Sequence, residues 1–245
     1  MFKRGLGKIL SSIGYRLVPT DGFRPNWDLD HFFQLLKNFG FAPQHIWDIG
    51  ANRGDWTRNA VRYFPDSEYT LLEPQNSLKE SLQDLFRRGC KIRWINAGAG
   101  ARGGTFPFYI SASDEGSSFL GVPRIAQEAL RQVDVPMRTL DEVLSTFALP
   151  VPEMLKIDAE GLDLKVLEGA VELLGKTEIV LVEVSIGQLD FENTPGAVIQ
   201  AMDRYGYRLI DITDLNRSPA HKVLWLSEFA FLLKSSRLLS KASRY

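Results

Sequence analysis

The segment WDIGANRGDWT, residues 47–57, places an acid and two glycines directly after an apolar stretch. Glycine allows a tight turn and lets a ligand approach the backbone, and the helix expected from Asp55 has free N–H groups at its start. Positions 52 and 57 are not glycine, so the segment lacks the dinucleotide fingerprint and does not favour a diphosphate. Asp48 ends the expected strand, where it can face a ligand amino group. Taken alone, the pattern is equally typical of a simple turn.

A second signal is Glu73, which follows the apolar segment Glu68–Leu72. It lies 23 residues after Gly50, close to the spacing of a strand–helix–strand unit, and a carboxylate there can accept hydrogen bonds from both ribose hydroxyls. Together with Asp48 and Gly54 it describes a pocket for a nucleoside without a phosphate. S-adenosylmethionine fits, because it carries a ribose, an adenine and a cationic amine.

A cluster of acids occupies LKIDAEGLD, residues 155–163, again after an apolar stretch. The carboxyl ends of parallel strands meet at the ligand-binding edge of an open sheet, so this segment is expected beside the first loop. Acids near a helix start stabilise it by up to ~1 kcal/mol, which suffices for Asp163. Asp158 differs, because an apolar strand places it at its very end. Alternation turns Lys156 away from the neighbours of Asp158 and favours a structural ion pair.

The elements that position these residues follow from apolar periodicity. Strands are expected at His45–Ile49, Glu68–Leu72, Lys91–Asn96, Met154–Asp158, Glu178–Val184, Tyr207–Ile212 and Glu228–Leu233, with further extended segments at Thr105–Ser111 and Val135–Thr139. Helices are expected at Asn26–Gly40, Asp55–Phe64, Gln75–Arg88, Leu140–Phe147, Leu162–Leu174 and Thr194–Tyr205. This alternation predicts an α/β fold with a mostly parallel sheet covered by helices on both faces. The last two strands lack a helical crossover, so they are expected to be antiparallel.

Composition excludes several classes. The 245 residues are 44% hydrophobic and carry a net charge of −1, which is ordinary for a globular protein. No apolar run reaches the ~20 residues that span a bilayer, and no signal peptide is expected. The single Cys90 allows no intrachain disulfide, which fits the cytoplasm. Three His and one Cys do not favour a zinc site. The acids leave Mg²⁺ open, but we expect no metal.

The charge is unevenly distributed. Residues 1–20 and 234–245 hold eight of the 29 Lys and Arg and no acid, so the body between them has a net charge of −9. An acidic body is a poor nucleic-acid binder, whereas the basic ends could touch an anionic membrane surface. We expect an N-terminal helical cap at 1–40, a catalytic domain at 41–235 and a basic tail at 236–245.

The ordered set of segments resembles the FkbM family of methyltransferases. MLKIDAEGLDLKVLEGAVELL, residues 154–174, is similar to the most distinctive block of that family, with Asp163 where the family usually has Glu. The nucleotide loop, ribose acid and Ser-rich loop of the family are similar to WDIGANRGDWT, LLEPQ and GSSFL, in that order. Two further motifs of the family are similar to MRTLDEVL and IVLVEVS. The similarity covers about residues 40–235.

The resemblance implies a class I, Rossmann-like methyltransferase that uses S-adenosylmethionine to methylate a hydroxyl of a sugar, glycan or secondary metabolite. It implies a seven-stranded sheet of order 3-2-1-4-5-7-6 whose last strand is antiparallel. The expected cofactor-binding residues are Asp48, Gly50, Asn52, Gly54, Glu73, Asn96, Ala97 and Asp158. Those expected to bind the acceptor are Ser117, Ser118 and His221.

Methyl transfer to a hydroxyl needs an aligned acceptor and a base that takes its proton. We expect Asp158 with Glu160 in this role, and Glu183, at the end of the next strand, as a further catalytic candidate. Two other functions remain open, a nicotinamide-dependent oxidoreductase and a non-catalytic nucleoside- or partner-binding protein at a membrane surface. The partner of the enzyme would be a small-molecule or glycan acceptor, with no oligomeric state assigned.

Overall fold

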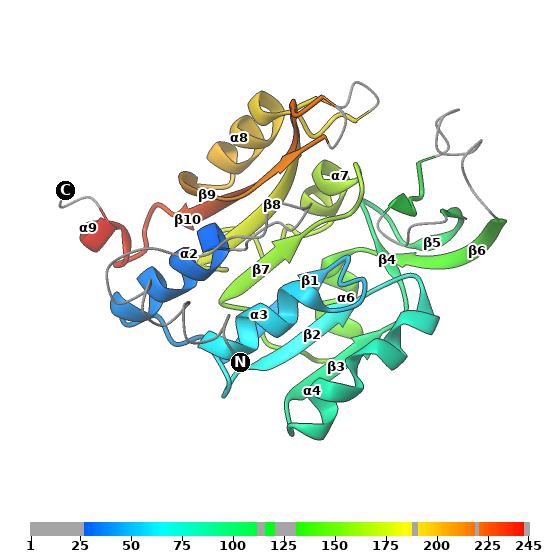
Figure 1. The fold of residues 1–245 in the computed structure, drawn as a ribbon, viewed down its shortest axis with the longest axis horizontal. Helices are drawn as coiled ribbons and strands as arrows, with labels where there is room; N and C mark the ends of the chain where they lie inside the picture. Colours follow the sequence, from blue (N-terminus) through cyan, green and yellow to red (C-terminus); the bar gives the residue numbers. More distant parts are fainter. Residues whose placement is uncertain (1–26, 112–115, 121–130, 188–190, 219–220, 243–245) are drawn as a thin grey trace, which may run out of the picture.

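The computed structural model describes residues 27–111, 116–120, 131–187, 191–218 and 221–242 (Figure 1). Its main sheet has seven strands in the order β3-β2-β1-β7-β8-β10-β9. Their bounds are β1 His45–Ile49, β2 Glu68–Leu72, β3 Lys91–Ile95, β7 Met154–Ile157, β8 Ile179–Ser185, β9 Tyr207–Arg217 and β10 Leu224–Leu233. Counted along the chain, this is the expected order 3-2-1-4-5-7-6. The last strand, β10, is antiparallel to both β8 and β9, and the other pairs are parallel.

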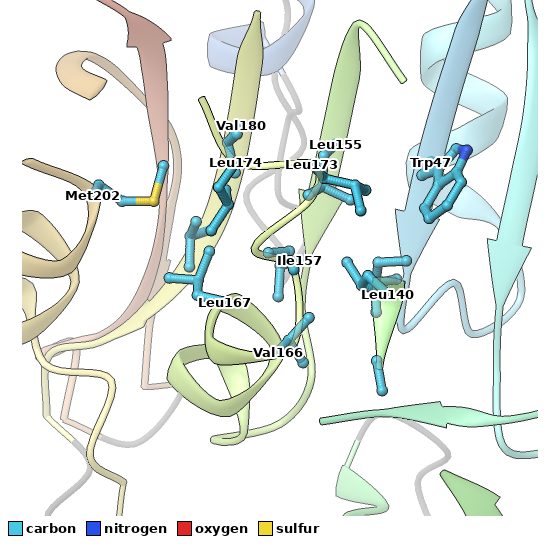
Figure 2. Close-up of a cluster of buried hydrophobic side chains, with 14 of the residues drawn as sticks. Trp47, Leu140, Leu155, Ile157, Val166, Leu167, Leu173, Leu174, Val180 and Met202 are labelled. Atoms are coloured by element: carbon cyan, nitrogen blue, oxygen red, sulfur yellow. The ribbon is translucent and has the colours of Figure 1, made fainter. Parts of the chain in front are cut away.

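Helices cover both faces of this sheet, as expected. One face is packed by α2 Trp27–Asn38, α3 Asp55–Tyr63, the 3₁₀ helix η1 Asn76–Leu82 and α4 Gln83–Arg87, and the other by α6 Leu140–Thr146, α7 Asp163–Glu168 and α8 Pro195–Arg204. Figure 2 shows the core between the sheet and the helices α6, α7 and α8. In it Trp47, Leu155 and Val180 of the sheet pack with helical side chains such as Val166 and Met202. Burial of this apolar surface is the main source of stability, at roughly 25 cal/mol per Å².

Alternation along the strands also places polar residues on one face. Ile46 of β1 and Met154 of β7 belong to the core under α2 and α3. Two residues further along each strand, on the same face, stand Asp48 and Lys156. On this face the first residues of the two strands are thus apolar and the residues near their carboxyl ends are polar. The candidate site therefore lies at the carboxyl ends of the strands.

A second, three-stranded sheet lies to one side of the main sheet (Figure 1). It consists of β4 Gly98–Ala99, β5 Gly104–Ile110 and β6 Arg131–Arg138 in the order β4-β6-β5. The expected extended segments at Thr105–Ser111 and Val135–Thr139 account for most of β5 and part of β6. A bridge between Tyr109 and Ser118, together with the packing of Phe119 on Phe108, holds the end of the Ser-rich loop against this sheet.

The helix expected at Leu162–Leu174 is wrong in length, because α7 ends at Glu168 and turns follow. At Gly169 the chain approaches the small sheet so closely that a Cβ would lie 2.2 Å from the carbonyl oxygen of Gly100. The carbonyl of Gly169 accepts the N–H of Asp141 instead of continuing the helix. The helix expected at Gln75–Arg88 is likewise divided into η1 and α4.

The last two strands are longer than expected, since β9 continues to Arg217 and β10 begins at Leu224. Their register extends past the end of β8, which is paired with β10 only as far as Ser185. Polar contacts maintain the pair near this point, where the Ser227 hydroxyl donates to the Asp214 carbonyl at 2.6 Å.

The two ends of the chain are described only in part. Of the expected cap at 1–40, residues 1–26 lie outside the described residues, and the remainder contains α2. The described part of the basic tail contains α9 Leu239–Ala242, which packs beside the end of α2, where the Lys241 ammonium donates to the Phe39 carbonyl and Leu238 is buried. Within the described ranges, no helix is long and apolar enough to cross a membrane.

Candidate active site

The turn after β1 depends on two glycines. Gly50, Asn52 and Gly54 all have positive φ, at 74°, 46° and 82°. A Cβ on Gly50 would lie 1.7 Å from the carbonyl oxygen of Asp158, and one on Gly54 would lie 2.3 Å from a methyl carbon of Leu82. Only glycine combines this backbone conformation with such close approach. The turn therefore lies directly against the end of β7.

Glu73 joins the turn after β1 to the end of β2. Its carboxylate accepts the N–H of Asn52 at 2.9 Å through one oxygen and the N–H of Gln75 at 2.8 Å through the other. Burial raises the pKa of Glu73 to about 7, against the opposing effect of these two hydrogen bonds. The Asn96 amide donates to the carbonyls of Glu73 and Pro74, so the end of β3 is fixed to the same point.

Lys156 is a buried cation between two carboxylates. Its ammonium lies 3.3 Å from Asp48, 3.1 Å from Asp158 and 3.3 Å from the carbonyl oxygen of Gly50. Burial favours the neutral amine, but the carboxylates of Asp158 and Asp48 outweigh this effect and raise the pKa of Lys156. Asp48 is itself fully buried, and its second oxygen accepts the hydroxyl of Thr57 at 2.6 Å. The expected structural role of Lys156 as an ion-pair partner agrees with this arrangement. Its expected orientation, away from the neighbours of Asp158, is wrong, because residues two apart along a strand stand on the same face and the two side chains pair at 3.1 Å.

The loop after β7 presents the other acids. Asp158 exposes a third of its side chain, and Glu160 has a positive φ of 49°, which is unusual for a residue with a side chain. Asp163 accepts the N–H groups of Ala159 and Gly161 at 3.0 and 3.3 Å, and burial raises the pKa of Asp163 to about 7. These bonds fix the loop after β7 to the buried start of α7.

Two glutamates face each other across β8 and β10. Glu183 is directly opposite Glu228 in the register, and Glu228 accepts the hydroxyl of Thr213 at 2.5 Å. Burial, followed by the nearby charge of Asp158, raises the pKa of Glu183 well above its usual range, and burial raises the pKa of Glu228 to about 7. One carboxylate oxygen of Glu183 is buried without a hydrogen-bond partner among the described residues.

These residues lie at one edge of the sheet, at the ends of β1, β2, β3, β7 and β8. A family model described as the methyltransferase FkbM domain matches residues 48–209, from the acid at the end of β1 to the start of β9. The chain belongs to the FkbM methyltransferase family. The matched part of the chain is thus a methyltransferase domain.

Solved structures include other methyltransferases with low sequence identity to this FkbM methyltransferase. The FkbM methyltransferase of Methylobacillus flagellatus KT is 16% identical, with a TM-score of 0.49, and the match covers 77% of this chain and 43% of that one. The precorrin-6y C5,15-methyltransferase of Geobacter metallireducens GS-15 is 14% identical, with a TM-score of 0.48, and the match covers 89% of this chain and 93% of that one. This chain thus spans less than half of the first of these proteins. No curated protein matches it.

The FkbM methyltransferase brings most of the expected site residues together. The expected cofactor residues occupy the ends of β1, β2, β3 and β7, and Ala97 there is buried. Of the residues expected to bind the acceptor, Ser118 donates to the carbonyl of Glu160 at 3.0 Å, whereas the Ser117 hydroxyl accepts the N–H of Ser111 within its own loop. His221 is exposed in the connection between β9 and β10, outside the paired part of these strands, which ends at Arg217 and Leu224. Their roles toward ligands stay predictions.

Sequence reasoning missed three of the polar residues that shape this site. Glu228 carried a signal, since it is an acid inside an apolar strand, as Asp158 is at the end of one. Thr57 and Asn193 carried none, because a polar residue in a helix or a loop is ordinary. Within the described residues, no group of three His, Cys, Asp or Glu side chains is arranged to hold a metal ion.

Proposed function

We propose that this enzyme transfers a methyl group from S-adenosylmethionine to a hydroxyl group of a sugar, glycan or secondary metabolite. The observation that carries the proposal is the contact between Gly50 and Asp158, whose carbonyl oxygen would lie 1.7 Å from a Cβ at position 50. This contact brings the turn after β1 directly beside Asp158, the first acid after β7. A donor held by the turn and a hydroxyl held by the acids would then be neighbours.

The residues at the turn suit the donor. Each oxygen of Glu73 accepts one backbone N–H, and a carboxylate oxygen has a second lone pair that can accept a ribose hydroxyl. Asn52, whose N–H bonds this carboxylate, and Asn96, whose amide bonds the backbone carbonyl of Glu73, would border the pocket, together with Gly54 of the same turn. Asp48 forms an ion pair with Lys156, so the charge of that acid is balanced inside the protein. When bound, S-adenosylmethionine supplies a methyl group on a cationic sulfur, which is an activated leaving group.

The acids at the ends of β7 and β8 suit the acceptor. Asp158 is partly exposed and can accept the proton of an acceptor hydroxyl at or before methyl transfer. Glu160, two residues further, borders the same space and is the second candidate for this base. Glu183 retains its proton to higher pH than an ordinary glutamate, so it can donate a hydrogen bond that orients the acceptor oxygen.

Membership of the FkbM family replaces the alternative of a nicotinamide-dependent oxidoreductase. We further propose a cytoplasmic enzyme that contacts a membrane surface through its basic ends. Liposome flotation of the full chain and of a variant without residues 1–20 tests the membrane contact. Flotation that is absent, or that survives the deletion, contradicts it.

Calorimetry with S-adenosylhomocysteine tests the donor site. We expect binding by the wild type, binding at least about tenfold weaker for Glu73→Ala, and unchanged binding for Glu68→Ala, an exposed acid at the other end of β2. Transfer of a radiolabelled methyl group to a panel of sugars, glycans and phenolic metabolites then tests the acceptor. Absence of binding contradicts the donor site, and methylation of an amine or a thiol in place of every hydroxyl contradicts the acceptor class.

A further inference from the structure

Asn193 is fully buried in the segment that connects β8 to α8. Its backbone carbonyl accepts the N–H of Ser185 at 2.9 Å, and its side-chain amide donates to the carbonyl of Glu183 at 3.1 Å. The next residue, Thr194, caps α8, whose first residue is Pro195. The position of Asn193 is therefore fixed by the end of β8 on one side and by the start of α8 on the other.

The same amide nitrogen donates to the carboxylate of Asp163 at 2.8 Å. The amide oxygen of Asn193 is buried and has no partner among the described residues, so its orientation is set by its two donor bonds. A flipped amide would place an oxygen against the carbonyl of Glu183 and the carboxylate of Asp163, and both contacts would be repulsive. The side chain thus links β8 to the start of α7 in one orientation.

Asp163 transmits this link to the loop after β7. It accepts the N–H groups of Ala159 and Gly161, which flank Glu160. Glu160 has a positive φ, a backbone conformation that persists only when the surrounding structure holds it. On the opposite side the Ser118 hydroxyl donates to the carbonyl of Glu160. The loop is consequently held by two sets of hydrogen bonds, one from Ser118 and one from Asp163. Asn193 belongs to the second set, because it holds Asp163.

We infer that Asn193 is a positioning residue for methyl transfer, which sets the loop of Asp158 and Glu160 relative to Glu183 through Asp163. The roles of these three acids rest on the proposed function. The geometric part does not, because it states only that Asn193 and Asp163 hold residues 158–162. A residue that merely contributed to packing would affect stability without a selective effect on this loop.

Asn193→Asp is the decisive variant, because it keeps the size of the side chain and replaces the donor by a carboxyl group that faces Asp163. Tyr207→Phe is the matched control, since it removes different hydrogen bonds at the other end of the sheet. The Tyr207 hydroxyl donates to the carbonyl of Thr177 at 2.7 Å and accepts the N–H of Gly175 at 3.1 Å. Hydrogen exchange of the free protein, measured by mass spectrometry, needs no acceptor. We expect amide exchange in 158–162 to become about tenfold faster in Asn193→Asp and to stay within about twofold in the control.

The double variant Asp163→Asn/Asn193→Asp provides the rescue. Its donor and acceptor are exchanged, so one hydrogen bond can re-form between positions 163 and 193 and part of the protection of 158–162 should return. With the acceptor found in the transfer assay, Asn193→Asp should lower kcat by about tenfold or more, with KM and S-adenosylhomocysteine affinity within about threefold.

Unchanged exchange in 158–162, equal acceleration in the Tyr207→Phe control, or no recovery in the double variant would overturn the inference. If Asn193→Asp does not fold, Asn193→Leu removes the donor of the same bond without adding a charge and is judged by the same exchange. If the wild type methylates no hydroxyl, the proposed function fails while the exchange result still decides whether Asn193 holds the loop. Altered exchange with unchanged kcat would limit Asn193 to stability and contradict its role in the reaction.

Discussion

The N–H of Asn52 donates to the carboxylate of Glu73 at 2.9 Å, which bonds the turn after β1 to the end of β2. The same carboxylate is buried, and burial raises its pKa to about 7. A ribose hydroxyl that donates to this group favours the ionised form. Ligand binding and proton release by Glu73 are therefore linked.

Cofactor affinity should rise with pH through this pKa. Below pH 7 the carboxyl is protonated and must lose its proton to accept both ribose hydroxyls, so the Kd of S-adenosylhomocysteine should fall by up to about tenfold per pH unit between pH 5.5 and 7. Above pH 8 it should be constant. Calorimetry in buffers of different ionisation enthalpy measures the released proton. A Kd independent of pH in the wild type, or an unchanged slope in Glu73→Gln, would contradict this linkage.

The stability of the free protein should show the opposite pH dependence. The pKa values of Glu73, Asp163 and Glu228 are raised to about 7 by burial, so the folded state binds these protons more tightly than the unfolded chain. Stability is then highest below pH 4–5 with respect to these groups, decreases as pH rises through about 7, and is constant from about one pH unit above that value. Urea midpoints between pH 5 and 8 measure the slope, which Glu73→Gln should reduce.

Removal of Lys156 should strongly destabilise the fold. Lys156→Met leaves the buried carboxylate of Asp48 without its counter-charge, at a cost of about 3–5 kcal/mol. Asp48→Asn in the same chain should restore part of this loss. Lys234→Met is the control, because its pair with Asp203 is exposed and should contribute less than about 1 kcal/mol. Urea unfolding that gives equal effects for the two lysines would refute the asymmetry.

Gly50→Ala should cost more than its backbone conformation explains. Gly89 has nearly the same φ, 76°, and a Cβ there would meet nothing within 4 Å, so Gly89→Ala measures the cost of positive φ alone, about 1–2 kcal/mol. At Gly50 the added carbon also collides with the carbonyl of Asp158. We expect the Gly50 variant to be less stable than the Gly89 variant by at least about 2 kcal/mol and to lose cofactor binding. Equal melting temperatures would show that the turn can move away from β7.

Asp158→Asn should separate catalysis from binding. If Asp158 accepts the acceptor proton, its amide should lower kcat by about 10²–10⁴-fold while S-adenosylhomocysteine still binds. Asp203→Asn, an exposed acid at the end of α8, should leave both quantities unchanged. Full turnover by Asp158→Asn would transfer the role of base to Glu160, whose own amide variant is then the test.

Much of the fold follows from local pattern. The apolar segments from His45 to Leu233 predicted all seven strands, their order followed from the family resemblance, and the missing crossover after Tyr207 predicted the antiparallel pair. Helix lengths were less accessible, because the end of α7 is set by the approach of Gly169 to Gly100, a contact between distant parts of the chain. The same limit applies to the site. Asp158 was visible as an acid ending an apolar strand, whereas the hydrogen bond from Asn193 to Asp163 joins the segment before α8 to the start of α7, 30 residues apart.

The position of Lys156 between Asp48 and Asp158 has an evolutionary consequence. One cation serves acids from two neighbouring strands, so a lineage that loses the lysine leaves two acids unbalanced, whereas one that first neutralises an acid leaves a balanced pair. Substitutions at these three positions should therefore be correlated among descendants of this sequence, with loss of the lysine disfavoured until an acid has been neutralised.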